Sequence, residues 1–356
     1  METILNIPVH KAETVATHQY DLNKLPFGKV PTSHLFLARY SAGEWADARI
    51  EPFHKLSLSP FALCFHYGQT VFEGMKAFRM HDGNISIFRP AKHHERFNRS
   101  LERMGMPHVP YELFLEGMRL LIATDAEWTP DSPGAALYIR PFVIATEERL
   151  GVKISDEYLF LIVCTPVGPY YARPIRVRVE TNYIRAAEGG TGYAKCGGNY
   201  GGALLPTKEA LDAGFDQVLW TDAGRKEFIE ESGTMNVMFI IDGILITPPV
   251  SSTILDGVTR DSILALARDR GITVQERLIS YHELEAAFGQ GLRVEAFGAG
   301  TASVLAPIES VTIGERTYNC YLAADAAMYA FKTELEAIRA GNQEDPHGWN
   351  EVVVCN

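Results

Sequence analysis

The chain has 356 residues, of which 46% are hydrophobic and 22% are charged. This composition is typical of globular proteins and excludes extensive disorder, and the length favours two domains over one. The 44 acidic against 33 basic residues give a net charge of −11, which disfavours nucleic acid as a partner. No window approaches the roughly 18 to 20 apolar residues of a membrane span, and no signal peptide is visible. We expect a cytoplasmic protein without a membrane partner.

The first half of the chain predicts a hairpin followed by helices and strands. Residues 70–79 and 85–89 are rich in β-forming residues, and Asp82-Gly83 between them favours a tight turn because glycine tolerates positive φ. Arg89-Pro90 ends the second strand. The periodicity of apolar residues then predicts helices at 91–105 and 111–126 and strands at 136–145 and 158–167.

The second half begins after residues 168–174, which contain two prolines and no regular pattern. We expect a small N-terminal α/β domain at 1–168, an interdomain loop at 169–175 and a larger C-terminal domain at 176–356. Its predicted elements are strands at 176–180 and 217–221, a hairpin at 235–247, and helices at 203–213, 259–270 and 321–340. Because most strands come as adjacent hairpins, mixed or antiparallel sheets are favoured over a doubly wound parallel one.

The stretch Tyr193-Ala-Lys-Cys-Gly-Gly-Asn-Tyr-Gly-Gly202 places Lys195 among glycines with no other charge. It is not a phosphate loop, because that motif has its lysine after the glycines. The dinucleotide fingerprint is also incomplete, since Gly298-Ala-Gly-Thr-Ala-Ser303 lacks the third glycine. A lysine whose amine is kept neutral can form a Schiff base with an aldehyde or ketone. The alternative is a surface lysine in a glycine-rich loop.

The segment Glu230-Glu-Ser-Gly-Thr-Met-Asn236 follows this lysine and leads into a very apolar strand. With it, the chain resembles the branched-chain aminotransferase family, within the pyridoxal-phosphate enzymes of fold type IV. Matching signatures run in collinear order along most of the chain: Val71-Phe-Glu-Gly-Met-Lys-Ala-Phe-Arg79, Phe88-Arg-Pro90, Lys195-Cys-Gly-Gly-Asn-Tyr200, Gln217-Val-Leu-Trp220 and Glu231-Ser-Gly-Thr-Met-Asn236. The resemblance implies a mixed α/β fold like that of D-amino-acid aminotransferase, with a pseudo-barrel in the larger, cofactor-binding domain.

The resemblance implies pyridoxal 5′-phosphate as the cofactor. Lys195 would hold it covalently and move the proton at the substrate Cα as general base and acid. Glu231 would accept a hydrogen bond from the ring nitrogen, Tyr200 would contact the phenolic oxygen, and Arg89 would bind the phosphate. Two turns that we expect to begin helices, Gly257-Val258-Thr259 and Gly300-Thr301-Ala302, would supply backbone amides. The implied cofactor-binding residues are Arg89, Lys195, Tyr200, Glu231, Thr234, Val258, Thr259 and Thr301.

The activity that the resemblance implies is reversible transfer of the amino group of L-leucine, L-isoleucine or L-valine to 2-oxoglutarate, which gives the branched 2-oxo acid and L-glutamate. The pocket would combine aromatic walls, Arg140 for the second carboxylate of glutamate, and a turn for the α-carboxylate. The implied substrate-binding residues are Tyr67, Phe72, Tyr138, Arg140, Tyr170, Thr301 and Ala302. The family is usually dimeric, so a homodimer is expected.

Alternatives remain at this point. A D-amino-acid aminotransferase and an aminodeoxychorismate lyase share the fold and the cofactor, and a non-enzymatic cofactor-binding protein is a third reading. The scattered cysteines, odd in number and without a C-x-x-C pair, predict reduced thiols and no metal site. His93-His94-Glu95-Arg96 lacks the H-E-x-x-H spacing of zinc enzymes, and we interpret it as a solvated helix face.

Overall fold

The computed structural model describes residues 6–13, 17–22, 25–168 and 173–355. These residues form two compact units. Unit 1 takes the described residues of 1–170 together with 194–198 and 336–355, and unit 2 takes 173–193 and 199–335. Among the described helices, none is long and apolar enough to cross a membrane.

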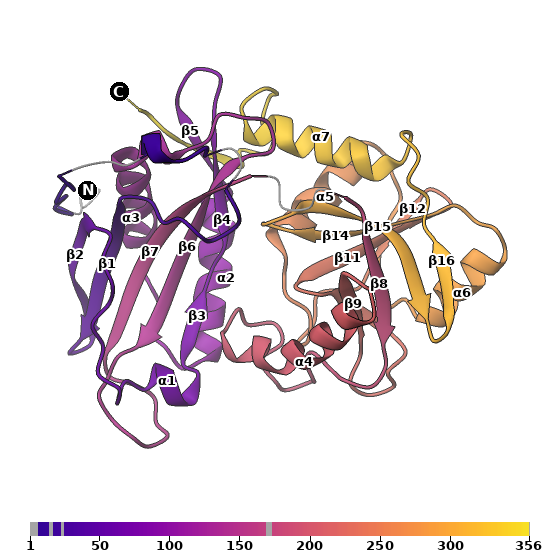
Figure 1. The fold of residues 1–356 in the computed structure, drawn as a ribbon, viewed down its shortest axis with the longest axis horizontal. Coiled ribbons are helices and arrows are strands. Elements are labelled where there is room, and N and C mark those ends of the chain that lie inside the picture. The colour runs from indigo at the N-terminus through magenta and orange to yellow at the C-terminus, as the bar shows by residue number, and fades with distance from the viewer. Residues whose placement is uncertain (1–5, 14–16, 23–24, 169–172, 356) are drawn as a thin grey trace. The chain divides into compact units, whose positions relative to one another are not determined.

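Unit 1 is built on an antiparallel sheet, which has eight strands within the described residues (Figure 1). Neighbours follow the order β17-β5-β4-β6-β7-β1-β2, and β3 also pairs with β6. The break between β3 and β4 falls at Glu73-Gly74, where a glycine is needed because a Cβ would overlap the Tyr138 hydroxyl. The strands are β1 (His34–Ser41), β2 (Glu44–Pro52), β3 (Thr70–Phe72), β4 (Met75–Arg79), β5 (Ile85–Phe88), β6 (Ala136–Ala145), β7 (Tyr158–Val167) and β17 (Asn350–Val353).

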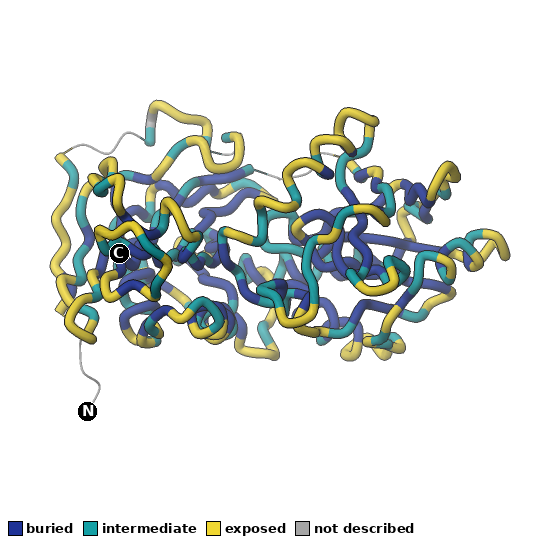
Figure 2. The backbone as a smooth tube through the Cα atoms, turned by 90° about the horizontal axis from the view of Figure 1, so that it is seen from below, coloured by how far each residue is buried: buried dark blue, intermediate teal, exposed yellow. Residues whose placement is uncertain are grey.

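The core of unit 1 forms where α2 (Pro90–Arg103) and α3 (Tyr111–Thr124) pack on this sheet. Phe160 of β7 lies 5.9 Å from Phe97 of α2 and 6.4 Å from Phe114 of α3, measured between ring centroids. Each fully buried phenylalanine contributes about 1.5 to 3 kcal/mol to folding. Figure 2 shows buried segments of the chain in dark blue. The short helix α1 (Cys64–Tyr67) precedes β3.

Unit 2 contains a mixed sheet that closes on itself. Its path runs β10-β9-β8-β15-β14-β11, and β10 also pairs with β11, so these strands form a barrel without a free edge. Strands β8, β9 and β15 pair in parallel, and the other barrel pairs are antiparallel. The strands are β8 (Ile175–Glu180), β9 (Gln217–Thr221), β10 (Ile229–Ser232), β11 (Met235–Ile241), β12 (Ile244–Thr247), β13 (Val274–Glu276), β14 (Val294–Gly300), β15 (Val304–Ile313) and β16 (Arg316–Asn319).

Most elements predicted from the sequence are confirmed, several with the same bounds, such as β6, β7 and β9. The remaining helices are α4 (Gly198–Asp212), α5 (Val258–Asp269), α6 (Tyr281–Gly289) and α7 (Ala327–Arg339). Helix α4 begins before the predicted residue 203, because the glycine-rich stretch is itself helical despite the low helix propensity of glycine. The β1–β2 hairpin was not predicted, and its strand β2 is exposed or half-buried over most of its length and carries several charged residues.

The predicted domain boundaries stay a prediction. Residues 169–172 of the expected interdomain loop lie outside the described residues. Two segments that the sequence assigned to the C-terminal domain cluster with unit 1 instead. Residues 194–198 do so because the Phe72 N–H donates to the Lys195 carbonyl, and 336–355 do so because β17 pairs with β5.

Within the described part of the chain, the buried guanidinium of Arg339 in unit 1 forms no ion pair with an acidic side chain. Arg339 is 3% exposed, and its Nε and Nη1 have no hydrogen-bond partner among the described residues. Its guanidinium lies 4.3 Å from the Phe88 ring centroid and 5.7 Å from that of Phe78. Burial lowers the pKa of Arg339 to about 9. The ionised side chain therefore destabilises the folded state at neutral pH.

Replacing Arg339 with methionine should raise the free energy of unfolding at pH 7 by about 1 to 3 kcal/mol, because an apolar chain of similar length removes the buried charge. The folded-state pKa lies below that of the unfolded chain, so the unfolded chain binds more protons above about pH 9. The parent should thus gain stability as pH rises from 9 to 11, and the variant should not. Urea unfolding at pH 7 and pH 10 measures both effects, and a variant less stable than the parent at pH 7 would contradict this expectation.

Candidate active site

Lys195 lies in a segment of unit 1 that backbone hydrogen bonds hold against strand β3. The Phe72 N–H donates to the Lys195 carbonyl at 3.0 Å, and the Gly197 N–H donates to the Thr70 carbonyl at 3.2 Å. On the other side, the Lys195 N–H donates to Ser100 Oγ at 2.9 Å. Gly197 must be a glycine because a Cβ there would overlap the Thr70 hydroxyl. One glycine of the Lys195 motif therefore serves close packing of the lysine segment on β3.

Four predicted site residues meet in unit 1. The Phe72 ring centroid lies 4.8 Å from Lys195 Nζ and 4.5 Å from the Arg140 guanidinium, which is within cation–π range of both. Arg140 Nη2 also donates to the Tyr138 hydroxyl at 2.8 Å. The buried Nε of Arg140 has no hydrogen-bond partner among the described residues. An amine, two aromatic rings and a cation with unused donor capacity thus form one cluster.

Tyr67, another predicted pocket residue, has its contacts elsewhere in unit 1. The Tyr67 hydroxyl accepts from the Gly151 N–H at 2.9 Å, and its ring lies 5.9 Å from that of His66. Tyr67 is 40% exposed at the end of α1. Tyr170 lies outside the described residues. The contacts of Tyr67 within the described part of the chain are thus with Gly151 and His66 rather than with the lysine.

Arg89 occupies a strained position at the start of α2. It is the N-cap, with φ 51° in the left-handed region, and Pro90 follows as the first helical residue. Such a conformation costs roughly 1 to 2 kcal/mol in a residue other than glycine. The Arg89 N–H donates to the Trp349 carbonyl at 2.6 Å, and its guanidinium lies 4.9 Å from the Trp349 ring centroid. The tryptophan before β17 thus helps to fix the predicted phosphate ligand.

Glu231 is buried in unit 2, where β10 pairs with β11. Its Oε1 accepts from the Leu255 N–H at 2.9 Å and from Asn236 Nδ2 at 3.4 Å. Its Oε2 forms an ion pair with Arg185 Nε at 3.2 Å, although without hydrogen-bond geometry. Neutral donors and a cation around a carboxylate favour its ionised form. Glu231 therefore has the surroundings of an acceptor for a positively charged group.

The start of α5 lies beside this carboxylate. Gly257 is the N-cap of α5, and a Cβ on it would overlap Asn236 Oδ1, the same amide side chain that donates to Glu231. Val258 and Thr259, the first residues of the helix, are buried. The predicted turn at 257–259 is thus a helix start, as expected. It packs against Asn236, which donates a hydrogen bond to Glu231.

The second predicted helix start is wrong. Residues 301–303 form the turn between β14 and β15, so Thr301 and Ala302 lie in a hairpin rather than at a helix N-terminus. The reason is that apolar strands continue on both sides of Gly300-Thr301-Ala302. Asn236 pairs with Ala299, which places this turn near the Glu231 hairpin. Thr234 is exposed in the β10–β11 turn, and Tyr200 is half-buried in the first turn of α4.

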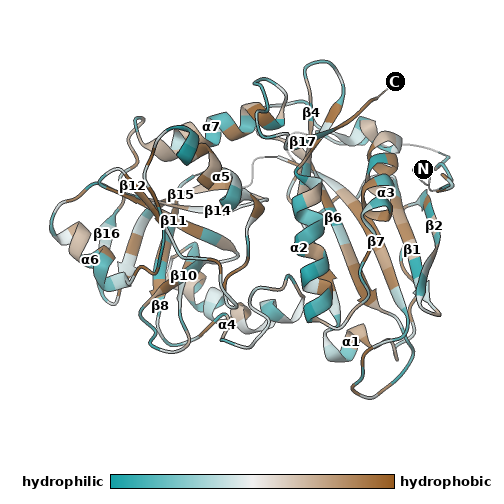
Figure 3. Cartoon of the chain, turned by 180° about the vertical axis from the view of Figure 1, so that it is seen from behind, coloured by the Kyte–Doolittle hydropathy of each residue, from teal (hydrophilic) through white to brown (hydrophobic). Residues whose placement is uncertain are grey.

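Sequence reasoning missed two sets of charged residues. The interpretation of His93-His94-Glu95-Arg96 as a solvated face is wrong for His93 and Arg96, which are buried and contact Glu73. Their i, i+3 spacing is the signal that one helix face is shared. Helix α2 is coloured mostly hydrophilic in Figure 3, which conceals that its polar face is partly internal. No local sequence pattern indicated that Arg185 would contact Glu231, because it is a single arginine in a loop.

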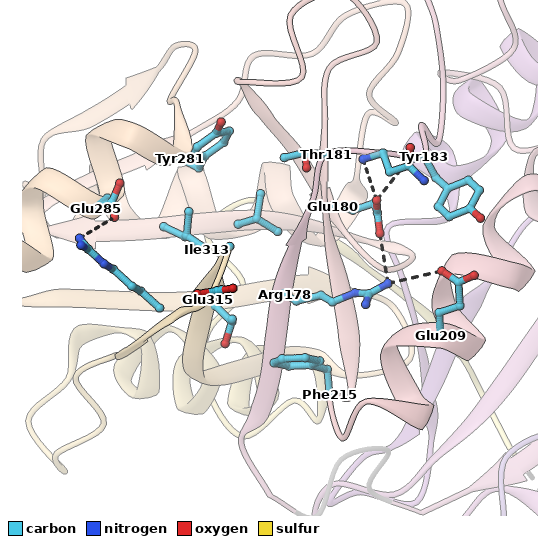
Figure 4. A pocket seen from close by; sticks show the side chains of 15 residues that line it. Arg178, Glu180, Thr181, Tyr183, Glu209, Phe215, Tyr281, Glu285, Ile313 and Glu315 are labelled. Atoms are coloured by element: carbon cyan, nitrogen blue, oxygen red, sulfur yellow. Dashed lines mark hydrogen bonds and ion pairs between the residues drawn. The ribbon is translucent and has the colours of Figure 1, made fainter.

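A cavity of about 750 Å³ in unit 2 is a separate feature (Figure 4). None of its lining residues belongs to the predicted site. Two ion pairs lie within this lining, Arg178 with Glu180 at 3.3 Å and Arg316 with Glu285 at 3.6 Å. Among the described residues, no group of three or more His, Cys, Asp or Glu side chains could hold a metal ion.

The family model described as amino-transferase class IV matches residues 70–311, which contain Lys195, Glu231 and Arg89. The chain belongs to this family. It is 42% identical over 341 residues to branched-chain-amino-acid aminotransferase 2 of Bacillus subtilis (strain 168), and this alignment covers 94% of each chain. It is 46% identical over 302 residues to branched-chain-amino-acid transaminase 1 of the same organism, which covers 83% of this chain and 85% of the relative.

A solved structure shares the fold of this chain. The branched-chain amino acid aminotransferase of Escherichia coli gives a TM-score of 0.72 at 26% identity. The alignment covers 90% of this chain and 99% of that one. The predicted mixed α/β fold of type IV is therefore confirmed.

Proposed function

We propose that this class IV aminotransferase is a branched-chain-amino-acid aminotransferase. It transfers the amino group of L-leucine, L-isoleucine or L-valine to 2-oxoglutarate, and the reverse reaction consumes L-glutamate. The observation that carries the proposal is the cluster of Lys195, Phe72, Tyr138 and Arg140, in a chain 42% identical to a Bacillus subtilis enzyme of that name. The cluster combines a reactive amine with apolar walls and one cation.

The cofactor is pyridoxal 5′-phosphate, and the residues present fit it. The buried Glu231 carboxylate suits a protonated ring nitrogen, and the planar Arg89 guanidinium suits a phosphate. Tyr200, Thr234, Thr301 and the amides of Val258 and Thr259 would complete its contacts. When bound, the cofactor supplies an electron sink for the charge that develops at the substrate Cα. Lys195 Nζ then accepts and returns the proton of that carbon.

The dual specificity follows from the way Arg140 is held. With a leucine side chain present, the guanidinium keeps its hydrogen bond to the Tyr138 hydroxyl and its contact with the Phe72 ring, so its charge is not left unsolvated. With glutamate present, its unused donors can bind the second carboxylate. We place the α-carboxylate at Thr301 and Ala302, and we keep Tyr67 and Tyr170 as proposed wall residues.

We further propose a homodimer in the cytoplasm. Support comes from large apolar side chains exposed on unit 1, among them Phe61, Phe65, Leu150 and Val152. Their two segments are joined by the hydrogen bond from the Arg149 N–H to the Phe61 carbonyl. Surfaces that associate commonly carry exposed apolar side chains.

The test is an amino-donor panel with 2-oxoglutarate as acceptor. L-leucine, L-isoleucine and L-valine should each yield L-glutamate and the matching 2-oxo acid, detected by chromatography. D-alanine and D-leucine should yield none, and aminodeoxychorismate should release no pyruvate. Turnover of the D-amino acids, or release of pyruvate, would instead assign the chain to the alternative activities that share this fold.

A further inference from the structure

A buried charge network lies next to the lysine segment. The carboxylate of Glu73, fully buried between β3 and β4, accepts two hydrogen bonds from Arg96, at 2.7 and 2.8 Å. It also contacts His93 Nδ1 at 2.8 Å. Despite burial, Arg96 and His93 hold the pKa of Glu73 well below its usual range, so the carboxylate is ionised. An ionised carboxylate only accepts, so His93 Nδ1 carries the proton and donates it.

The network is close to neutral in total charge. Burial lowers the pKa of His93 to about 4, and Arg96 and Lys195 act in the same direction, so this imidazole is neutral at physiological pH. The charge on Glu73 then cancels that on Arg96. Removing one member of such a buried pair leaves the charge of the other without compensation, which is costly. Neither Glu73 nor Arg96 takes part in the proposed reaction.

Two short connections join this network to Lys195. Glu73 directly follows Phe72, whose N–H donates to the Lys195 carbonyl and whose ring faces its amine. On α2, Ser100 Oγ donates to the Arg96 carbonyl at 2.9 Å and accepts the Lys195 N–H at 2.9 Å. The Glu73–Arg96 pair therefore ties together the strand and the helix that hold the two sides of the lysine backbone.

We propose that Glu73 is a positioning residue for Lys195: its carboxylate neutralises Arg96 and fixes Phe72 and Ser100, which hold the lysine. The inference rests on the proposed function and adds a residue that the reaction itself does not touch. The buried ionisable groups on the elements that hold the Lys195 segment include Glu73, the neutral His93, Arg96 and Lys76, and α2 also carries the exposed Arg99 beside Ser100. With Glu73 neutralised, Arg96 loses the negative charge that offsets its own near the amine.

The test is a pH titration of the visible absorption of lysine-bound pyridoxal phosphate in the holoenzyme. Glu73→Gln should lower the pH midpoint by about 1 unit, because the uncompensated positive charge that it leaves on Arg96 disfavours a proton on Lys195 Nζ. The double variant Glu73→Gln/Arg96→Met, which removes both charges, should return the midpoint to near the parent value. If Glu73 has only a structural role, the double variant should shift the pH midpoint further from the parent value than the single variant does.

Two further variants keep the test decisive. Glu95→Gln removes an exposed carboxylate from the same helix and should leave the midpoint unchanged. Ser100→Ala keeps the Glu73–Arg96 pair but removes the acceptor of the Lys195 N–H, so kcat should fall several-fold with the midpoint and the KM for leucine unchanged. This variant tests positioning even if Glu73→Gln does not fold.

The outcomes separate this inference from the proposed function. A parent protein that attaches no pyridoxal phosphate would overturn the proposed function and this inference with it. Attachment in the parent, with an unshifted midpoint in folded Glu73→Gln, would overturn the inference alone. So would a double variant that shifts further than the single one, or a Ser100→Ala variant with the kcat of the parent.

Discussion

Replacing Lys195 with alanine should lower kcat for L-leucine and 2-oxoglutarate by at least about 10⁴-fold, the upper range for loss of a general acid–base group. The variant loses both the covalent attachment and the base that takes the Cα proton. The aromatic neighbour Phe72 cannot replace an amine. Glutamate formation followed by a coupled assay measures the effect, and Lys208→Ala, an exposed lysine of α4 paired with Asp212, is the matched control.

Borohydride trapping checks the same residue without relying on turnover. In the parent protein, reduction should fix the cofactor to the peptide that contains Lys195, as detected by mass spectrometry. In Lys195→Ala no peptide should carry it, although the unchanged Arg89 and Glu231 should still bind the cofactor reversibly. A variant that keeps more than a tenth of the parent kcat, or cofactor fixed to another lysine, would sink the proposed role.

The Glu231→Gln variant should lower kcat by about 10² to 10³-fold, the range for removal of one preorganised electrostatic contact. Glutamine keeps the size and can still accept from the Leu255 N–H, but it lacks the charge that keeps a ring nitrogen protonated. It also leaves Arg185 without its ion-pair partner. Steady-state kcat and the absorption of the bound cofactor together measure the loss.

Glu230→Gln is the matched control for this experiment. Glu230 is the adjacent buried acid, burial raises its pKa, and its Oε1 accepts from the Thr253 hydroxyl rather than from the Glu231 partners. Its neutralisation should change kcat by less than about tenfold, since no ligand contact is proposed for it. Equal losses in the two variants would contradict a specific role for Glu231.

The parts of the site that the sequence predicted are those coded by contiguous motifs. Lys195, Glu231 and the signature around Arg89 each stand in a short stretch whose residue types already suggest their chemistry. Glu73 stood in such a stretch too, but its role depends on His93 and Arg96, some twenty positions away on a hydrophilic helix. No local pattern reports that pairing.

The same limit applies to the fold. The strands β6, β7 and β9 were predicted because each is a short segment rich in apolar and β-branched or aromatic residues. The closure of the barrel depends on β10 pairing with both β9 and β11, and that is a property of the sheet rather than of any one segment. The Gly300-Thr301-Ala302 turn was assigned to a helix since a short glycine turn has the same composition before a helix as within a hairpin.

The pairing of β17 with β5 has a consequence for synthesis on the ribosome. Asn350 aligns with Phe88, and the preceding Trp349 carbonyl receives the Arg89 N–H, so these partners are made more than 250 residues apart. A nascent chain can close the barrel of unit 2 before β17 has been translated. The edge of β5 that later pairs with β17 therefore stays unpaired during synthesis. A chain stopped before residue 349 would also leave Arg89 without the carbonyl that fixes its backbone.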